Sequence, residues 1–135
     1  MKISNAEGRK LLAKQPRKQG NEESKLQQSI VKWFRLQYPE YKMLLTAIPN
    51  GGNRNAITGA ILKREGVVAG YPDLLLAVPK NGYHALFIEV KYGDNQLSPK
   101  QKTIIAELRE QVYAVRTVWN LEQAQTGIKG YLAEF

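Results

Sequence analysis

Two apolar segments in the middle of the chain limit what it can fold into. Residues 73–78 and 83–90 are rich in leucine, isoleucine and valine at both sets of alternating positions, and Lys80, Asn81 and Gly82 lie between them. A strand that is apolar on both faces has to be covered on both sides. We therefore expect a hairpin in the middle of a sheet, with helices packed against each face.

The connection between the two segments predicts which residues face each other. A three-residue loop, formed by a type I turn followed by Gly82 in the left-handed conformation, pairs Pro79 with Tyr83. Carried along the strands, this register places Asp73 directly opposite Glu89. Cβ atoms of residues paired in this way lie about 4.5–5.5 Å apart. The sequence therefore predicts two adjacent carboxylates on central strands.

Two such carboxylates are unfavourable by themselves, because like charges repel and each loses hydration on burial. Mg²⁺ would relieve the repulsion, since it prefers oxygen ligands and is usually held by one or two carboxylates with substrate phosphate. Lys91 projects from the same face as Glu89 and would orient a metal-activated water or stabilise charge on the phosphate. The alternative is a surface ion pair between Glu89 and Lys91 with Asp73 capping a turn, but unpaired charges on buried strands are rare.

The flanking segments carry helical or strand periodicity and complete a single domain. The order is helix, strand, short helix, two strands, helix, strand and helix, which predicts a mixed α/β fold. Four strands then form one mixed sheet flanked by helices. The predicted helices cover residues 21–37, capped by Asn21, 56–65, 98–112 and the segment capped by Asn120, and the two outer strands cover residues 43–48 and 113–118.

The charged residues indicate a polyanionic partner. The net charge is +8, and six lysines or arginines against one glutamate fall in residues 1–20, which we interpret as a basic arm preceding a domain over residues 21–135. Nucleic acid is the first candidate for such a partner. The chain has no cysteine and one histidine, so a metal site would have to use oxygen ligands. We expect no organic cofactor.

The sequence lacks an apolar run long enough to span a membrane, and Met1-Lys2-Ile3 is followed by polar residues. We therefore expect a cytoplasmic protein with no membrane partner. Tyr131, Leu132 and Phe135 are apolar candidates for a subunit interface, although the sequence does not assign one.

Several other polar residues are candidates for the site. Glu23 and Gln27 project from the apolar stripe of the first helix. A role as a third carboxylate that reaches the metal would explain the position of Glu23. The alternative is that Glu23 is an acid in the first helical turn, where it stabilises the helix. Gln101 also projects from an apolar stripe, yet Ser98 and Gln101 have the spacing of a capping box. The sequence leaves both roles of Gln101 open.

The composition of residues 50–54, rich in asparagine and glycine, is typical of a turn. The glycines would also let a phosphate backbone approach closely. We take Lys63 on the short helix as a further phosphate contact. The residues assigned to nucleic-acid binding are Asn50, Gly51, Gly52, Arg54, Gln27 and Lys63.

Together these segments resemble the PD-(D/E)xK nuclease superfamily and, more closely, the virus-type replication-repair nuclease (VRR-NUC) domain. The resemblance covers about residues 21–118, most of the chain. The motifs that carry it are Glu23-x-x-x-Gln27, Pro49-Asn50-Gly51-Gly52-x-Arg54, Gly66-x-x-x-Gly70-x-Pro72-Asp73, Phe87-Ile88-Glu89-x-Lys91 and Leu97-Ser98-x-x-Gln101. One departure is Val112-Tyr113 where the family usually has Gly-Tyr.

The resemblance implies roles for particular residues. Glu23, Asp73, Glu89 and the backbone carbonyl of Val90 would bind Mg²⁺, for which Mn²⁺ would substitute. Lys91 would be the catalytic lysine, and Gln101 an active-site polar residue. Members of the family cut DNA at junctions, flaps or other branches, and the stand-alone type, which this chain resembles, acts as a homodimer on Holliday junctions.

These observations predict a metal-dependent DNA endonuclease that selects branched DNA in replication or repair. The alternative is a catalytically inactive nucleic-acid-binding module that has kept the fold. Such modules normally lose an acid or the lysine, whereas Glu23, Asp73, Glu89 and Lys91 are all present.

Overall fold

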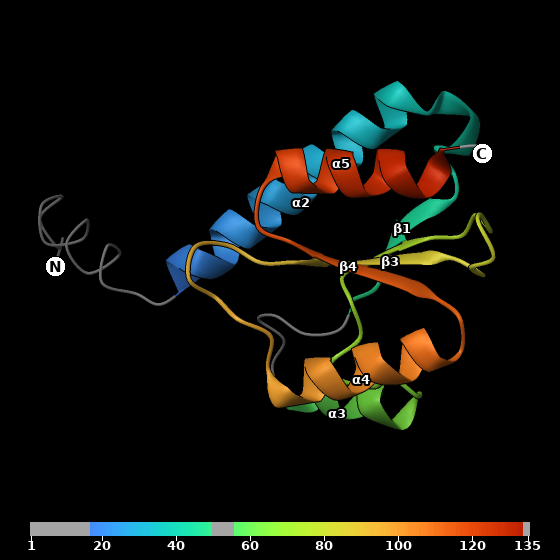
Figure 1. Cartoon of the computed structure of the whole chain (residues 1–135). Helices are drawn as coiled ribbons and strands as arrows, with labels where there is room; N and C mark the ends of the chain where they lie inside the picture. Colours follow the sequence, from blue (N-terminus) through green and yellow to red (C-terminus); the bar gives the residue numbers. More distant parts are fainter. Residues whose placement is uncertain (1–16, 50–55, 134–135) are drawn as a thin grey trace, which may run out of the picture.

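The computed structural model describes residues 17–49 and 56–133, and it confirms a mixed α/β domain (Figure 1). The predicted nucleic-acid contacts Asn50, Gly51, Gly52 and Arg54 lie outside the described residues, as does most of the basic arm. The elements are α2 (Arg17–Gln37), the 3-10 helix η1 (Pro39–Tyr41), β1 (Leu45–Ala47), α3 (Ala56–Arg64), β2 (Leu74–Leu76), β3 (Leu86–Val90), α4 (Pro99–Glu110), β4 (Ala114–Val118) and α5 (Leu121–Leu132).

The four strands form one mixed sheet in the order β1-β2-β3-β4. The β1–β2 and β2–β3 pairs are antiparallel, and β3 and β4 are parallel. Helices α2 and α5 lie on one side of the sheet, and α3 and α4 lie on the other (Figure 1). All five residues of β3 are buried, which confirms the prediction of a central strand covered on both faces.

Each face of the sheet has its own apolar cluster. On the side of α2 and α5, Ile30 and Phe34 pack with strand residues such as Ile88 and with Ile128. On the side of α4, the cluster consists of Phe87, Ile105, Leu108 and Val115. Neighbouring residues of β3 therefore alternate between the two clusters, and this strand is fixed from both sides.

The hairpin has the predicted strand register, but its turn differs from the prediction. Lys80 and Tyr83 exchange both backbone hydrogen bonds, at 2.8 and 3.2 Å, so the loop has two residues, not three. Asn81 and Gly82 both have positive φ, of 51° and 85°, as a type I′ turn requires.

The strand pairing compensates for the shorter loop. Between the turn and the Leu76–Leu86 pair, three residues (77–79) lie opposite two residues (84 and 85). The extra residue shifts the register by one position, as in a β-bulge. Leu74 consequently pairs with Ile88, so that the next opposed positions are Asp73 and Glu89, as predicted.

Helix α2 begins at Arg17, so the prediction that Asn21 caps it was wrong. The segment between Pro16 and Asn21 contains no proline, and the cost of one glycine inside a helix is only about 1 kcal/mol. The first four residues of the helix fall in the segment that we interpreted as the arm.

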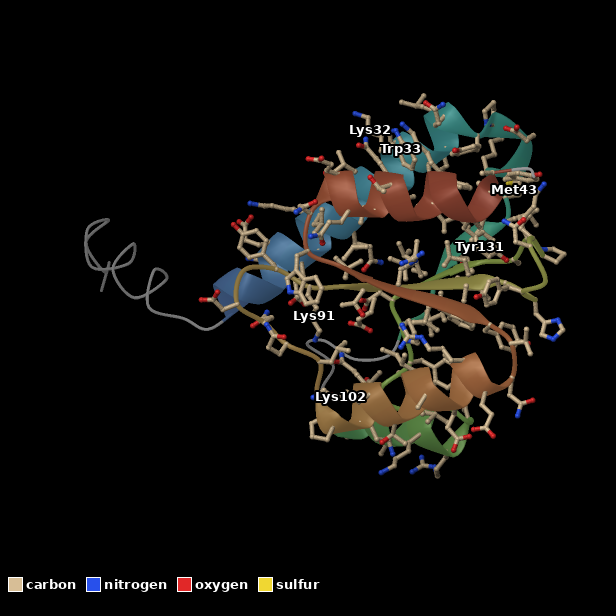
Figure 2. The ribbon with its side chains drawn as sticks, viewed as in Figure 1. Lys32, Trp33, Met43, Lys91, Lys102 and Tyr131 are labelled. Carbon is tan, nitrogen blue, oxygen red and sulfur yellow. The ribbon has the colours of Figure 1, made fainter. Side chains whose placement is uncertain are left out.

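The suggestion that Tyr131 and Leu132 form a subunit surface was also wrong. Their exposed fractions are 7% and 8%, and both belong to the main apolar cluster. The Tyr131 hydroxyl donates a hydrogen bond of 2.6 Å to the carbonyl of Val78, and the residue lies between α5 and the sheet (Figure 2). Phe135 lies outside the described residues.

Val112 lies in the connection between α4 and β4, whereas the sequence predicted that the helix extends to residue 112. Its φ is +65°, and its side chain is 45% exposed. The Val112 N–H donates to the carbonyl of Arg109, and that of Tyr113 donates to Leu108, so the residue ends the helix in the left-handed conformation. This backbone explains why glycine is the expected residue here, since glycine adopts positive φ freely and a β-branched residue such as valine is strained there.

Replacing Val112 by Gly is expected to raise the free energy of unfolding by about 1 kcal/mol. The left-handed conformation costs a non-glycine residue about 1–3 kcal/mol, and part of the gain is lost to the greater freedom of glycine in the unfolded chain. Urea denaturation measures the difference. The control is Val68→Gly, a 46% exposed valine without a positive φ, which is expected to lower stability. A Val112→Gly variant no more stable than the parent would contradict this account.

Candidate active site

Asp73 and Glu89 come together on neighbouring strands. Asp73 directly precedes β2, and Glu89 is the fourth residue of β3. An Oδ2 atom of Asp73 accepts a hydrogen bond of 2.7 Å from the backbone N–H of Val90, which fixes the carboxylate against β3. Glu89 is 3% exposed. The hairpin thus holds two acidic side chains side by side at the end of the strand pair.

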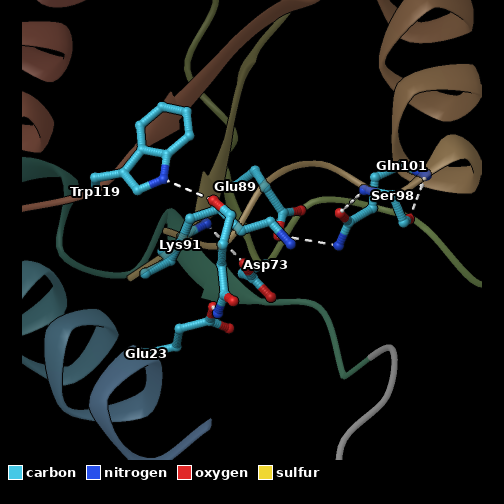
Figure 3. A network of polar contacts seen from close by, with 9 residues as sticks. Glu23, Asp73, Glu89, Lys91, Ser98, Gln101 and Trp119 are labelled. Carbon is cyan, nitrogen blue, oxygen red and sulfur yellow. Dashed lines mark hydrogen bonds and ion pairs between the residues drawn. The ribbon is translucent and has the colours of Figure 1, made fainter. Parts of the chain in front are cut away.

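Glu89 has fewer partners than a buried carboxylate requires. Its Oε2 atom accepts a hydrogen bond of 3.3 Å from Nε2 of Gln101 and lies 4.0 Å from Nζ of Lys91 (Figure 3). Its Oε1 atom is buried and has no hydrogen-bond partner. A buried oxygen without a partner costs several kcal/mol in general, so this atom is suited to a ligand.

The environment favours the protonated form of both acids. Burial raises the pKa of Glu89, and the adjacent charge of Asp73 raises it further, to about 9. Burial also raises the pKa of Asp73, although the hydrogen bond from the Val90 N–H opposes this shift. Two like charges in a buried site resist simultaneous ionisation. Without a cation, the pair therefore retains a proton at neutral pH, and a hydrogen bond between the two carboxyl groups holds it on Glu89.

The metal-free protein is expected to lose stability as the pH rises. Between the ordinary pKa of 4.5 and the value of about 9, folded Glu89 keeps a proton that the unfolded chain releases. The free energy of unfolding therefore falls with pH across this interval. Urea denaturation in EDTA at pH 5.5 and 8.5 measures the fall, and Glu89→Gln is expected to reduce it.

The matched control is Glu107→Gln, an exposed glutamate on α4, which is expected to keep the pH dependence of the parent protein. Equal pH dependence in the parent and in Glu89→Gln would show that the Glu89 carboxyl does not carry this proton.

Lys91 lies on the same face of the strand as Glu89. Its exposed fraction is 9%, and its side chain points into the space between the sheet and α4 (Figure 2). Its backbone N–H donates to the carbonyl of Val118 on β4, which extends the parallel pairing to this residue. The strand thus places the Lys91 ammonium group beside the Glu89 carboxylate. Because the side chain is buried, the ammonium group has little access to solvent.

Glu23 reaches the site from α2 and is half-buried. Its Oε2 atom accepts a hydrogen bond of 2.6 Å from Nδ2 of Asn95, whose carbonyl accepts one of 2.9 Å from Nε1 of Trp119 (Figure 3). The negative charge of Glu23 contributes to the raised pKa of Asp73 and of Glu89. The carboxylates of Glu23, Asp73 and Glu89 therefore lie near enough to influence one another. Hydrogen bonds from uncharged residues, Trp119 to Asn95 and Asn95 to Glu23, orient the Glu23 side chain.

Asn95 and Trp119 were not among the predicted site residues. Asn95 lies two residues after Gly93 in the segment that follows β3, where the sequence is typical of an ordinary turn. Trp119 directly follows the predicted strand over residues 113–118. The only available signal was that a tryptophan N–H usually needs a partner when it is buried.

Gln101 takes part in the predicted capping box and also contacts Glu89. Its backbone N–H donates to Oγ of Ser98 at 3.1 Å, and its Oε1 accepts from the Ser98 N–H at 2.8 Å, which completes the capping box of α4. The nitrogen of the same side-chain amide, Nε2, donates a hydrogen bond to Oε2 of Glu89. Because the cap uses the oxygen of the side-chain amide, the nitrogen is directed at the carboxylate.

The donor set fits a hard divalent cation. Asp73 and Glu89 provide carboxylate oxygens, and one oxygen of Glu89 has no protein partner. Within residues 17–49 and 56–133, however, no three His, Asp or Glu side chains are arranged to hold a metal together. Mg²⁺ is commonly bound by one or two carboxylates, with water and phosphate as further ligands. Two acids, completed by water and phosphate, therefore match this pattern.

The other predicted contacts are divided between the two sides of the sheet. Gln27 lines a cavity of about 720 Å³ that also reaches Glu23, Asp73 and Val90. Lys63 is exposed on α3, on the opposite side of the sheet from α2, and does not line this cavity. The structure thus brings Gln27 to the carboxylates but does not bring Lys63 into the cavity beside them.

Comparison with known proteins agrees with this fold. The VRR-NUC domain profile matches residues 6–119. A solved structure of a VRR-NUC domain protein is 27% identical, with a TM-score of 0.70, over 82% of this chain and 87% of that chain. No curated protein matches the sequence. The chain belongs to the VRR-NUC domain family, a family of nucleases.

The described part of the chain contains no helix with the length and hydrophobicity needed to cross a membrane.

Proposed function

We propose that this protein is a Mg²⁺-dependent endonuclease of the PD-(D/E)xK type that hydrolyses phosphodiester bonds in DNA, with Mn²⁺ as a substitute. The observation that supports this most directly is the buried Glu89 carboxylate, which has one oxygen without a partner, beside Asp73. A purely structural site would satisfy or remove such a group. Membership of a nuclease family supports the same reaction class.

Asp73, Glu89 and the backbone carbonyl of Val90 would hold the cation. When bound, Mg²⁺ would polarise the scissile phosphate and lower the pKa of a coordinated water, which attacks phosphorus. Gln101 keeps Glu89 oriented through its side-chain amide. Glu23, fixed by Asn95, would act on the ion through a bound water, since the three acids do not form one metal-binding group.

Lys91 is the residue suited to act on the phosphate and the attacking water. Its Nζ atom lies 4.0 Å from Glu89, and the protein covers most of its side chain. A cationic donor held beside a reacting phosphate stabilises the negative charge that develops in the transition state. It would also keep the attacking water in line with the bond that breaks.

Branched DNA, including Holliday junctions, is the proposed substrate, and a homodimer is the proposed active form. The net charge of +8 supports a nucleic-acid substrate. A two-fold symmetric dimer would present two active sites to two strands of a symmetric junction. Membership of the VRR-NUC family also supports a nucleic-acid substrate.

Asp73→Asn and Lys91→Ala are each expected to lower the cleavage rate by at least about a hundredfold, because Asp73 would hold the cation and Lys91 would stabilise charge on the reacting phosphate. The assay uses labelled four-way junction and linear duplex with Mg²⁺, with Mn²⁺ and with EDTA. Matched controls are Asp94→Asn and Lys102→Ala, both exposed, which are expected to cut at the rate of the parent protein.

Cleavage retained by both site variants would refute the assignment of the active site. Binding of the junction by the parent protein without any product under either metal would instead indicate a catalytically inactive binding module.

Analytical ultracentrifugation is expected to give twice the 15.3 kDa mass of the chain, because a dimer would supply both cuts on a symmetric junction. A monomer at micromolar concentration that still cuts both strands of the junction in one binding event would contradict the dimer.

A further inference from the structure

The cavity beside the carboxylates extends well beyond them along α2. Its volume is about 720 Å³. We call it the α2 groove; its lining residues are Ser24, Gln27, Gln28, Val31, Lys32, Arg35 and Leu36, with Glu23, Asp73 and Val90 at the end nearest the active site.

The residues of α2 in this groove follow one helical stripe. From Ser24 to Arg35 they recur at spacings of three and four, which places them in one row along the helix surface. Eleven residues of helix span about 16 Å. The α2 groove is therefore a straight path that begins at the candidate metal site and leads away from it, toward Lys32 in Figure 2.

The volume exceeds what a metal and its waters need. A water molecule accounts for about 30 Å³, so even six metal ligands occupy a minor part of the space. Cavities of about 300–1,000 Å³ commonly hold organic molecules of moderate size. The α2 groove has room for parts of the substrate on one side of the phosphate that reacts.

The chemistry of the lining changes along the row. Gln27 and Gln28 present amides near the acids, and Nε2 of Gln28 donates to Oγ of Ser24 at 3.1 Å. Farther along, Lys32 and Arg35 form no ion pair with any residue in the described part of the chain. Leu36, 76% exposed, lies at the far end. The groove thus offers amide, cationic and apolar contacts in one line.

We infer that the α2 groove binds an unpaired stretch of the DNA strand that is cut, directly beside the scissile phosphate. This inference rests on the proposed nuclease function. Unpaired nucleotides expose base edges to amides, base faces to apolar side chains and phosphates to cations, whereas a paired duplex presents mainly its phosphates outward. Val31 and Leu36 would contact bases or sugars, and Lys32 and Arg35 the phosphates that follow.

The test is fluorescence anisotropy of the full chain with a labelled single-stranded 12-mer and with a blunt hairpin duplex, both in EDTA so that nothing is cut. Lys32→Ala combined with Arg35→Ala is expected to weaken single-strand binding at least about tenfold. It should also reduce the slope of log K against log salt by about 1.4, the value for two lost phosphate contacts on a single strand.

Matched variants separate the groove from general electrostatics. Lys25→Ala combined with Lys42→Ala removes two exposed charges outside the groove and is expected to weaken single-strand binding far less. Leu36→Ser is expected to weaken single-strand binding without changing the salt slope. Blunt duplex binding should fall equally in the two double variants.

Equal losses of single-strand affinity in the two double variants would overturn the inference. So would a larger loss on the duplex, or no measurable single-strand binding by the parent protein. Because the assay contains no cleavage step, its outcome is separate from that of the proposed function. Groove-dependent binding by a protein that cuts nothing would contradict only the nuclease, and cleavage with unchanged groove variants would contradict only the groove.

Discussion

The electrostatic repulsion between Asp73 and Glu89 is the constraint on which the rest of the site depends. The hairpin holds both acids at one end of a strand pair, where Glu89 is buried and Asp73 is partly buried at the edge of the cavity beside α2. Their neighbours compensate in part: the Val90 N–H bonds to Asp73, and Gln101 bonds to Glu89. These contacts leave Oε1 of Glu89 buried without a hydrogen-bond donor, and a cation bound to this oxygen would compensate for the missing donor.

The opposition of Asp73 and Glu89 was predictable from the sequence, although two errors cancelled in reaching it. Asn81-Gly82 is the standard signal for a two-residue type I′ turn, and that turn by itself would have placed the strands one residue out of register. The extra residue within 77–79 restores the pairing. Pro79 is a residue that sheets tolerate at bulges, but a proline alone does not say how many residues the bulge adds, and the packing of both faces of β3 decides the register.

Which surface a helix covers was harder to predict than the helix itself. Tyr131 and Leu132 form an apolar stripe that suits either a core or an interface, and only the position of α5 over the sheet distinguishes the two. The contact between Glu23 and Asn95 joins residues 72 positions apart and depends on how α2 crosses the end of β3. By contrast, Lys91 followed directly from strand alternation once Glu89 was placed.

The capping box of α4 has a consequence for how the candidate site would respond to heat. Gln101 belongs both to the first turn of this helix and to the hydrogen bonds of Glu89. Helix ends open locally at a much lower free energy than the central strands of a sheet. Fraying of one turn at Ser98 would therefore release the carboxylate while the sheet stays intact, and catalytic competence would be lost at a lower temperature than the fold.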